Sequence, residues 1–135
     1  MFDPVDVVCF DLDDTLWPCR PVLERAEQTV FEWLSTHCPA VTEKYSSSGL
    51  VKRRMAYMSQ QMHLQHDMTS MRYNFFIELF KDFGIRDPDF ARQALNIFRS
   101  ARNEVQPFDD VVPALRKLQN KYVLTSYSNG NAQLE

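Results

Sequence analysis

Near its start the chain reads Phe10-Asp11-Leu12-Asp13-Asp14-Thr15-Leu16. An apolar run rich in β-branched side chains leads into this stretch, and it predicts a buried strand ending at Asp11; the run consists of Val5, Val7, Val8, Cys9 and Phe10. In extended backbone, residues two positions apart point to the same side, so Asp11 and Asp13 are expected to project together. The stretch therefore predicts two neighbouring carboxylates at the C-terminal tip of a strand.

Such a pair of carboxylates indicates a metal site. The two charges repel each other, and a hard divalent cation with oxygen ligands relieves the repulsion, so Mg²⁺ is expected on Asp11 and Asp13. One carboxylate could then attack phosphorus and form an aspartyl-phosphate. The other could donate a proton to the leaving oxygen and later accept one from water. The alternative for D-x-D alone is an acidic turn that only caps a helix.

A second apolar run, Tyr122 to Tyr127, predicts another strand and leads into Ser128-Asn129-Gly130. A hydroxyl group and backbone N–H groups at such a position form a binding site for an anion. We expect Ser128 to hydrogen-bond a phosphoryl oxygen, and Asn129 and Gly130 to offer N–H groups. The alternative is a hairpin, because Asn-Gly is a favoured two-residue turn.

The stretch from Trp17 to Lys121 is far longer than the roughly dozen residues that a parallel crossover needs. Helical periodicity or capping signals mark several parts of it, namely Pro21 to Leu34, Tyr73 to Gly84, Asp87 to Ala101 and a helix capped by Asp109 or Asp110. The sequence therefore predicts an α/β protein. Its core, residues 1–18 and 106–135, would be Rossmann-like with parallel strands, and residues 19–105 would form an inserted helical subdomain.

Within the helical block, the stripe Phe76, Phe80 and Phe83 is expected to lie in a core. Polar side chains of the block could contact a substrate, and an arginine could grip a second anionic group. His66 and Arg72 are the preferred candidates. The others are Arg53, Arg54, His63 and Asp67. The alternative for each is a solvated helix face.

The bulk composition excludes several classes of partner. The net charge of −3 provides no basic field for nucleic acid or an anionic membrane. Neither a signal peptide nor an apolar run of about 18 residues is visible. The three cysteines, Cys9, Cys19 and Cys38, are odd in number and lack C-x-x-C spacing, so reduced thiols in a cytoplasmic protein are expected.

The first motif, an apolar strand followed by D-x-D-x-T, resembles the first signature of the haloacid dehalogenase-like (HAD) superfamily. In this resemblance Asp11 stands at the nucleophile position and Asp13 at the acid/base position. The true dehalogenases of the superfamily lack the second aspartate, so Asp13 argues for phosphoryl chemistry rather than carbon–halogen cleavage. The strand that ends at Ser128 matches the second signature.

The inserted helical subdomain resembles the α-helical cap of the first HAD subclass, which closes over the site and selects substrates. Several stretches resemble bacterial capped phosphatases of the flavin pathway, namely Asp14 to Leu16, Arg20 to Val22, His66 to Arg72 and Asn129 to Ala132. The resemblance implies a Mg²⁺-dependent phosphomonoesterase that acts on a small phosphorylated metabolite. FMN and 5-amino-6-(5-phosphoribitylamino)uracil are the candidate substrates.

The resemblance also implies a lysine and a second acidic pair after the second motif, for which no residue before Glu135 is available. We therefore expect a truncated chain that is unstable or inactive alone, because two strands are too few for a stable sheet. A second hypothesis is an inactive remnant that binds phosphate or a partner without turnover. A third, a phospho-accepting signalling domain, is disfavoured because such domains have short connections.

Overall fold

The computed structural model describes residues 5–130, so the predicted ends of the core and the Asn131-Ala132 part of the second motif lie outside the described residues. The chain divides into two compact units. One, here called the strand unit, consists of residues 5–22 and 104–130; the other, the helical unit, is Leu23–Asn103. Their assignment as enzyme core and cap stays a prediction.

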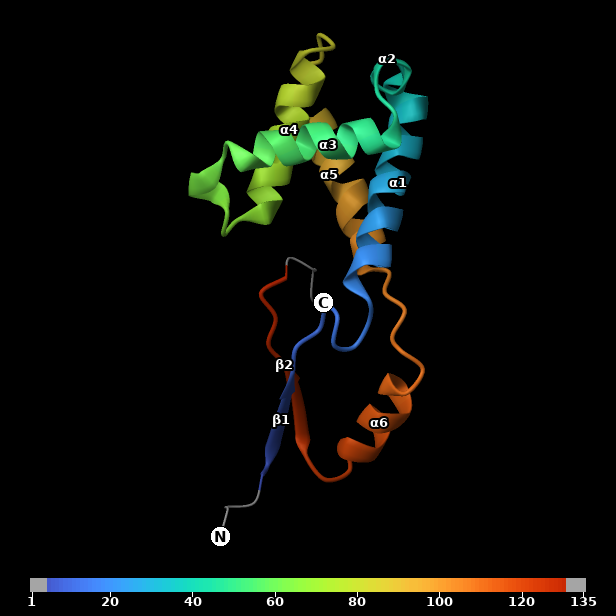
Figure 1. Ribbon diagram of the computed structural model, residues 1–135, viewed down its shortest axis with the longest axis vertical. Helices are drawn as coiled ribbons and strands as arrows, with labels where there is room; N and C mark the ends of the chain where they lie inside the picture. Colours follow the sequence, from blue (N-terminus) through green and yellow to red (C-terminus); the bar gives the residue numbers. More distant parts are fainter. Residues whose placement is uncertain (1–4, 131–135) are drawn as a thin grey trace. The chain divides into compact units, whose positions relative to one another are not determined.

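The strands and helices follow one another as labelled in Figure 1. The strand unit contains β1 (Val7–Phe10), α6 (Val111–Leu118) and β2 (Val123–Ser126). Helix α1 (Cys19–His37) begins in the strand unit and continues into the helical unit. The rest of the helical unit consists of α2 (Pro39–Lys44), α3 (Ser47–Ser59), the 3-10 turn η1 (Met62–Leu64), α4 (Met68–Lys81) and α5 (Pro88–Asn103).

Strands β1 and β2 lie side by side and run parallel, as predicted for an α/β fold (Figure 1). Their register pairs Val7 with Val123 and Phe10 with Ser126. The backbone N–H of Tyr127 donates to the carbonyl of Phe10 at 2.9 Å, which extends the pairing beyond the last strand residue. Because parallel strands end at the same edge of a sheet, the residues after Phe10 and after Ser126 leave the sheet at one edge.

The prediction that β1 is buried is wrong. Its residues alternate between exposed and half-buried, and Val7 and Val123 are 53% and 65% exposed. Two strands form the sheet within residues 5–130, so each strand has one edge without a neighbouring strand. The expectation that apolar faces on Val7, Cys9 and Val123 would lack cover is confirmed.

Capping contacts explain where the helices begin and end. Helix α1 begins at Cys19 rather than Pro21, because its first N–H donates to the Asp14 carboxylate at 2.8 Å. Ser46 is the N-cap of α3, and its side chain accepts a hydrogen bond from the N–H of Gly49. Gly84, with a φ of 77°, follows α4 as predicted for a C-terminal glycine.

The prediction that an aspartate side chain caps the N-terminus of α6 is wrong. Asp110 occupies the N-cap position, but its own backbone is helical and its side chain makes no capping hydrogen bond. A capping side chain needs extended backbone to reach the first free N–H groups of the helix.

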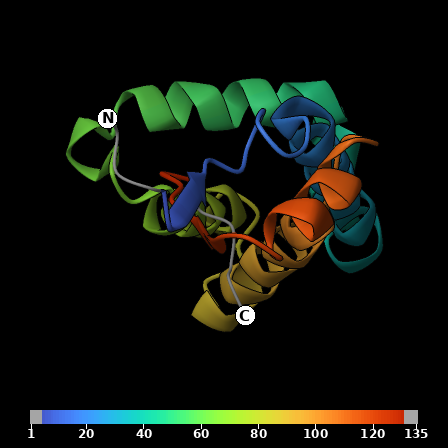
Figure 2. The same ribbon diagram turned by 90° about the horizontal axis from the view of Figure 1, so that it is seen from below.

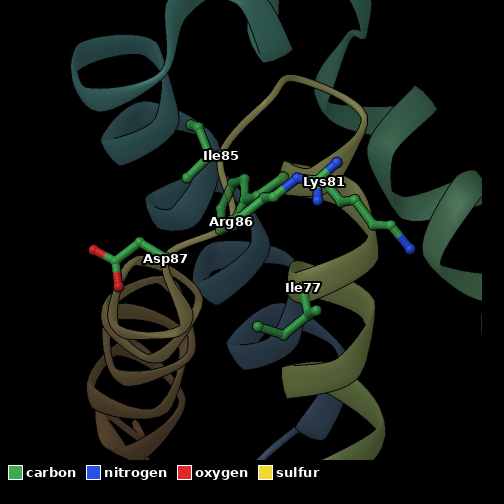
Figure 3. Close-up of a pocket in the computed structure, with 6 residues that line it drawn as sticks. Ile77, Lys81, Ile85, Arg86 and Asp87 are labelled. Carbon is green, nitrogen blue, oxygen red and sulfur yellow. The ribbon is translucent and has the colours of Figure 1, made fainter.

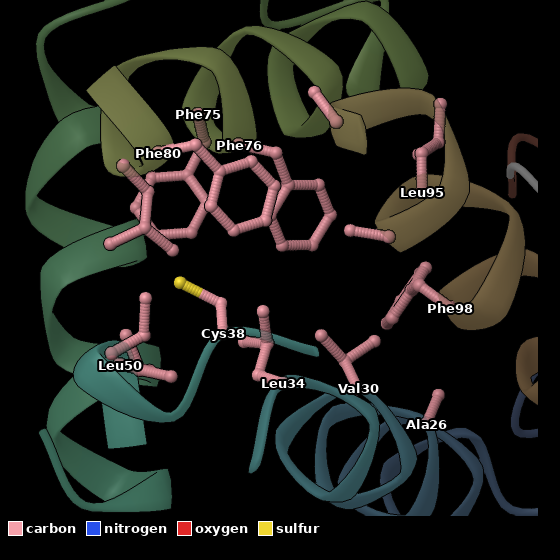
Figure 4. Packing of buried hydrophobic residues seen from close by; sticks show 14 of the residues in the cluster. Ala26, Val30, Leu34, Cys38, Leu50, Phe75, Phe76, Phe80, Leu95 and Phe98 are labelled. Atoms are coloured by element: carbon pink, nitrogen blue, oxygen red, sulfur yellow. The ribbon is translucent and has the colours of Figure 1, made fainter. Parts of the chain in front are cut away.

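The helical unit has an apolar core to which α1, α4 and α5 all contribute (Figure 4). In the same unit, α3 packs against α4 and α4 against α5 (Figures 1 and 2). The rings of Phe76 and Phe80 stack with centroids 5.9 Å apart, and Phe90 meets Phe80 edge-on at 4.7 Å. Phe76 and Phe80 are buried as predicted, whereas Phe83 is half-buried.

The three cysteines are free thiols, with Cys9 exposed, Cys19 half-buried and Cys38 buried. Across residues 5–130, no helix combines the length and the apolar character that a bilayer crossing requires.

Candidate active site

The first motif leaves β1 after Phe10 and folds into a tight turn. The N–H groups of Thr15 and Leu16 both donate to the carbonyl of Leu12, at 3.1 and 2.8 Å, and that of Asp14 donates to Trp17 at 2.7 Å. Asp14 has a φ of 59°, a left-handed conformation that aspartate adopts more readily than most residues. The turn holds the motif at the C-terminal tip of β1.

The aspartates of this turn have different surroundings. Asp14 caps α1, so its carboxylate has a structural task. Asp11 is exposed, and its nearest side-chain hydrogen bond comes from the Thr15 hydroxyl at 3.4 Å. Asp13 is half-buried, and its Oδ1 accepts a hydrogen bond from the indole Nε1 of Trp17 at 3.0 Å. Asp11 is therefore the more accessible carboxylate, and Asp13 the more firmly held.

The two predicted motifs meet at Gly130. A Cβ placed on this glycine would lie 2.8 Å from Oδ2 of Asp13 and 3.2 Å from the hydroxyl oxygen of Ser128. The Asp13 carboxylate and the Ser128 hydroxyl therefore both lie against the Cα of Gly130. This arrangement brings the residues after β1 and the residues after β2 into one site within the strand unit.

The second motif differs in one respect from its predicted arrangement. The N–H of Gly130, expected to face a phosphoryl group, donates to the Ser128 hydroxyl oxygen at 3.0 Å. The hydroxyl can still donate its own hydrogen, because a serine oxygen both accepts and donates. Asn129 is exposed. Ser128 can therefore still donate a hydrogen bond to a ligand.

Of the two preferred candidates in the helical unit, His66 is exposed in the turn between η1 and α4. Arg72 is only 7% exposed, in disagreement with a surface role in substrate contact. Its guanidinium bonds Glu27 at 2.8 Å and lies 3.4 Å from the ring centroid of Phe98. These contacts bind Arg72 into the core of the helical unit, so we do not retain it as a substrate residue.

Glu27 also pairs with Arg54, at 2.9 Å, so one carboxylate serves two buried guanidinium groups. The pKa of Arg72 is lowered to about 10, mainly by desolvation; the charge of Glu27 opposes this shift, and the charge of the nearby Arg54 adds to it. Arg72 nevertheless remains a cation at neutral pH. The cluster of Glu27, Arg54 and Arg72 accordingly depends on the single negative charge of Glu27.

Two of the remaining candidates, Arg53 and Asp67, also have structural partners. Arg53 donates to Asp82 and to the Tyr45 hydroxyl. Asp67 is the N-cap of α4. Its pKa is lowered mainly by a hydrogen bond from the side chain of Ser70, and to a lesser extent by one from the backbone N–H of Ser70. His63 is exposed. These contacts account for Arg53 and Asp67 without a ligand.

A surface pocket of about 110 Å³ lies at the end of α4 (Figure 3). Ile77, Phe80 and Ile85 give it apolar walls, and Lys81, Arg86 and Asp87 complete its lining. Lys81 and Arg86 extend in similar directions, whereas Asp87 points away from them (Figure 3). Neither predicted motif contributes a residue to this pocket.

No protein-family model matches the chain. It is 28% identical to the 5-amino-6-(5-phospho-D-ribitylamino)uracil phosphatase YigB of Escherichia coli, over 97% of this chain and 56% of that protein. It also resembles the crystal structure of a 2-haloacid dehalogenase from Pseudomonas syringae pv. tomato, with a TM-score of 0.76 and 29% identity, over 96% of this chain and 57% of the other.

The chain thus resembles proteins of the HAD superfamily in sequence and in fold. A further HAD structure, the hydrolase YfnB of Bacillus subtilis bound to magnesium, has a TM-score of 0.56 at 17% identity and shares the fold. This chain covers 54% of YfnB. It thus spans about half the length of the relatives it matches.

The first motif has two side chains of the kind that bind magnesium. Asp11 and Asp13 offer carboxylate oxygens, which are the ligands that Mg²⁺ prefers. Within residues 5–130, no group of three or more His, Cys, Asp or Glu side chains could hold a metal ion. The two aspartates fit Mg²⁺ in chemistry, and they would supply only part of its coordination shell.

The sequence analysis missed one residue of the candidate site. Trp17 was assigned only to the start of the stretch between the strands, but its indole N–H contacts Asp13. The spacing of four residues between an aspartate and a tryptophan was the available signal. It has no meaning until the turn of residues 11–17 brings the two side chains together.

Replacing Gly130 by alanine is expected to lower the turnover of the full-length protein roughly tenfold to a hundredfold, because the new methyl would displace the Asp13 carboxylate. The measurement is kcat on a phosphomonoester. Gly49→Ala is the matched control, since Gly49 lies in α3 near Ser46 and outside the site. Equal activities of the two variants would contradict the close approach at Gly130.

Proposed function

We propose that the full-length protein is a Mg²⁺-dependent phosphomonoesterase that works through an aspartyl-phosphate on a small phosphorylated metabolite. The observation that carries this proposal is the convergence of the Asp13 carboxylate and the Ser128 hydroxyl on Gly130, at the edge where β1 and β2 both end. Ligands of open α/β sheets bind outside the C-terminal ends of the strands. The relationship to YigB supports phosphoryl chemistry.

In the proposed reaction, Asp11 is the nucleophile, because it is exposed at the tip of β1. An oxygen of Asp11 forms a bond to phosphorus as the bond from phosphorus to the ester oxygen breaks. Asp13 gives its proton to that leaving oxygen and then takes a proton from the water that attacks the aspartyl-phosphate. Release of phosphate restores Asp11, so the cycle needs no other reactant than water.

Other groups of the strand unit would bind the phosphoryl group. The Ser128 hydroxyl would donate to a phosphoryl oxygen, while the Gly130 N–H holds that hydroxyl in place. Mg²⁺, bound by Asp11 and Asp13, would offset negative charge on the phosphoryl group. The role of the exposed Asn129 as a further donor remains part of this proposal.

The helical unit would act as a cap that selects substrates. It lies between β1 and β2 in the chain and has an apolar core of its own. Its exposed His66 is the retained candidate for substrate contact. The name of YigB favours 5-amino-6-(5-phosphoribitylamino)uracil as the proposed substrate, with FMN as the other candidate.

Cleavage of a carbon–halogen bond is the second candidate function, because one similar structure is a 2-haloacid dehalogenase. That reaction displaces halide and needs no acid for a poor oxygen leaving group. The presence of Asp13, held by Trp17 at the site, favours the phosphatase.

The test is to incubate the full-length protein with phosphomonoesters and, separately, with a 2-haloacid. We expect phosphate release that falls at least about a hundredfold when EDTA removes divalent metal and that returns with added Mg²⁺. Halide release without phosphate release would overturn the proposal. Phosphate release that persists in EDTA would overturn its metal dependence.

A further inference from the structure

A small cavity lies beside the charged cluster of Glu27, Arg54 and Arg72, to which α1, α3 and α4 each contribute one residue. The cavity has a volume of about 20 Å³, and these three residues form the charged part of its lining. Ser47 adds a hydroxyl group, and the rest of the lining is apolar. Because a cavity needs about 10–15 Å³ to hold one water molecule, this one has room for a single small group. A phosphorylated metabolite is too large for it.

The side chains of the cluster leave one positive charge uncompensated. Arg54 and Arg72 are 8% and 7% exposed, and both bond the same oxygen of Glu27, Oε1, at 2.9 and 2.8 Å. Arg72 is a cation at neutral pH, since its pKa, lowered mainly by desolvation, is still about 10. Within residues 5–130, Glu27 is the only carboxylate paired with either arginine. Two buried cations thus share one anion, and a buried charge without a partner is costly.

Arg54 is the less well satisfied of the two arginines. The ring of Phe98 lies 3.4 Å from the Arg72 guanidinium and offsets part of its charge. By contrast, Nη1 of Arg54 faces the sulfurs of Met58 and Met55, at 3.0 and 3.9 Å, and a thioether is a weak acceptor. The buried Nε of Arg54 has no hydrogen-bond acceptor among residues 5–130. A strong acceptor is therefore needed beside Arg54, where the cavity lies.

We propose that this cavity is a binding site for a small monovalent anion, such as chloride, held by the guanidinium groups of Arg54 and Arg72. A water molecule would accept a hydrogen bond there, but it carries no charge and leaves the excess positive charge in place. A chloride ion does both, since it accepts N–H groups and supplies the second negative charge that the cluster lacks. The site takes no residue of the candidate active site, and the inference does not depend on the proposed phosphatase function.

The first experiment measures the thermal unfolding midpoint of the full-length protein while gluconate replaces chloride at constant sodium concentration. Gluconate keeps the ionic strength but is too large for the cavity. With about 0.2 M chloride and a dissociation constant of about 10 mM, we expect a midpoint roughly 3–5 °C higher than in gluconate. Bromide, which is similar in size to chloride, should have the same effect. Equal midpoints in chloride and gluconate would overturn the proposal.

Two variants separate the site from a general effect of the salt. Arg54→Met leaves one arginine with Glu27, so no charge remains uncompensated, and its midpoint should no longer depend on chloride. Arg53→Met is the matched control. Arg53 precedes Arg54 in α3 and carries the same charge, but it pairs with the exposed Asp82 and lies outside the lining of the cavity. We expect this control to keep the chloride dependence. The same dependence in Arg54→Met would overturn the proposal.

A direct measurement needs no variant and decides the question even if Arg54→Met fails to fold. Crystals of the full-length protein grown with bromide in place of chloride should show an anomalous scattering peak within hydrogen-bonding reach of Arg54 and Arg72. A water molecule alone at that position, without an anomalous peak, would overturn the proposal. Phosphate release enters none of these measurements, so a protein that lacks phosphatase activity would overturn the proposed function and leave this inference standing.

Discussion

Asp11→Asn is expected to lower phosphate release by the full-length protein roughly 10⁴-fold while the protein stays folded. An amide is not a nucleophile toward phosphorus, so the aspartyl-phosphate cannot form. Asn has nearly the same size as Asp, and Asp11 is exposed with a long 3.4 Å contact to Thr15, so the fold loses little. The measurements are kcat with Mg²⁺ and the thermal unfolding midpoint.

Asp109→Asn is the matched control for this variant. Asp109 belongs to the same strand unit and is exposed just before α6, and the substitution removes the same charge. We expect the control to keep its turnover within about twofold. An Asp11→Asn protein with more than about a tenth of the wild-type turnover would contradict the nucleophile assignment.

The second large effect concerns stability and does not depend on the proposed function. Glu27→Gln is expected to lower the free energy of unfolding by about 3–5 kcal/mol, because it leaves the buried guanidinium groups of Arg54 and Arg72 without a compensating charge. The side chain of Glu27 is only 18% exposed, so water replaces little of the lost interaction. Urea unfolding of the purified protein measures the change.

Glu32→Gln is the control for the stability prediction, since Glu32 lies on the exposed side of the same helix and contacts Gln28. It is expected to change the free energy of unfolding by less than about 0.5 kcal/mol. Adding Arg54→Met to Glu27→Gln should recover part of the loss, because it removes one uncompensated charge. Similar values for Glu27→Gln and Glu32→Gln would contradict the role of the cluster.

Much of the fold follows from local patterns. The periodic apolar residues of α1, α4 and α5 predicted these helices, and the apolar runs before Asp11 and Ser128 predicted β1 and β2. The predictions failed where the outcome depends on tertiary surroundings or on the local backbone conformation. The exposure of β1 depends on what covers the sheet, and the missing cap at Asp110 depends on a backbone that is already helical there.

The prediction of the site also succeeded where local sequence was sufficient and failed where tertiary contacts decided. The order of the motifs placed Asp11, Asp13 and Ser128 after parallel strands, because chain order and strand polarity are properties of the sequence. Arg72 was misjudged because its partner Glu27 lies 45 positions away, and no periodicity connects residues so far apart. A buried arginine and a solvated one look alike in a sequence.

By itself, then, the sequence determined α1, α4, α5 and α6, the two strands and the residue types that follow them, since these depend on neighbours within a few positions; it did not predict α2 or α3. Only the tertiary structure decided which side chains meet. The contact of Trp17 with Asp13, the approach of Asp13 to Gly130 and the enclosure of Arg72 all require the chain to have folded. Hydrogen bonds and ion pairs act over a few ångströms in space, whatever the separation in the chain.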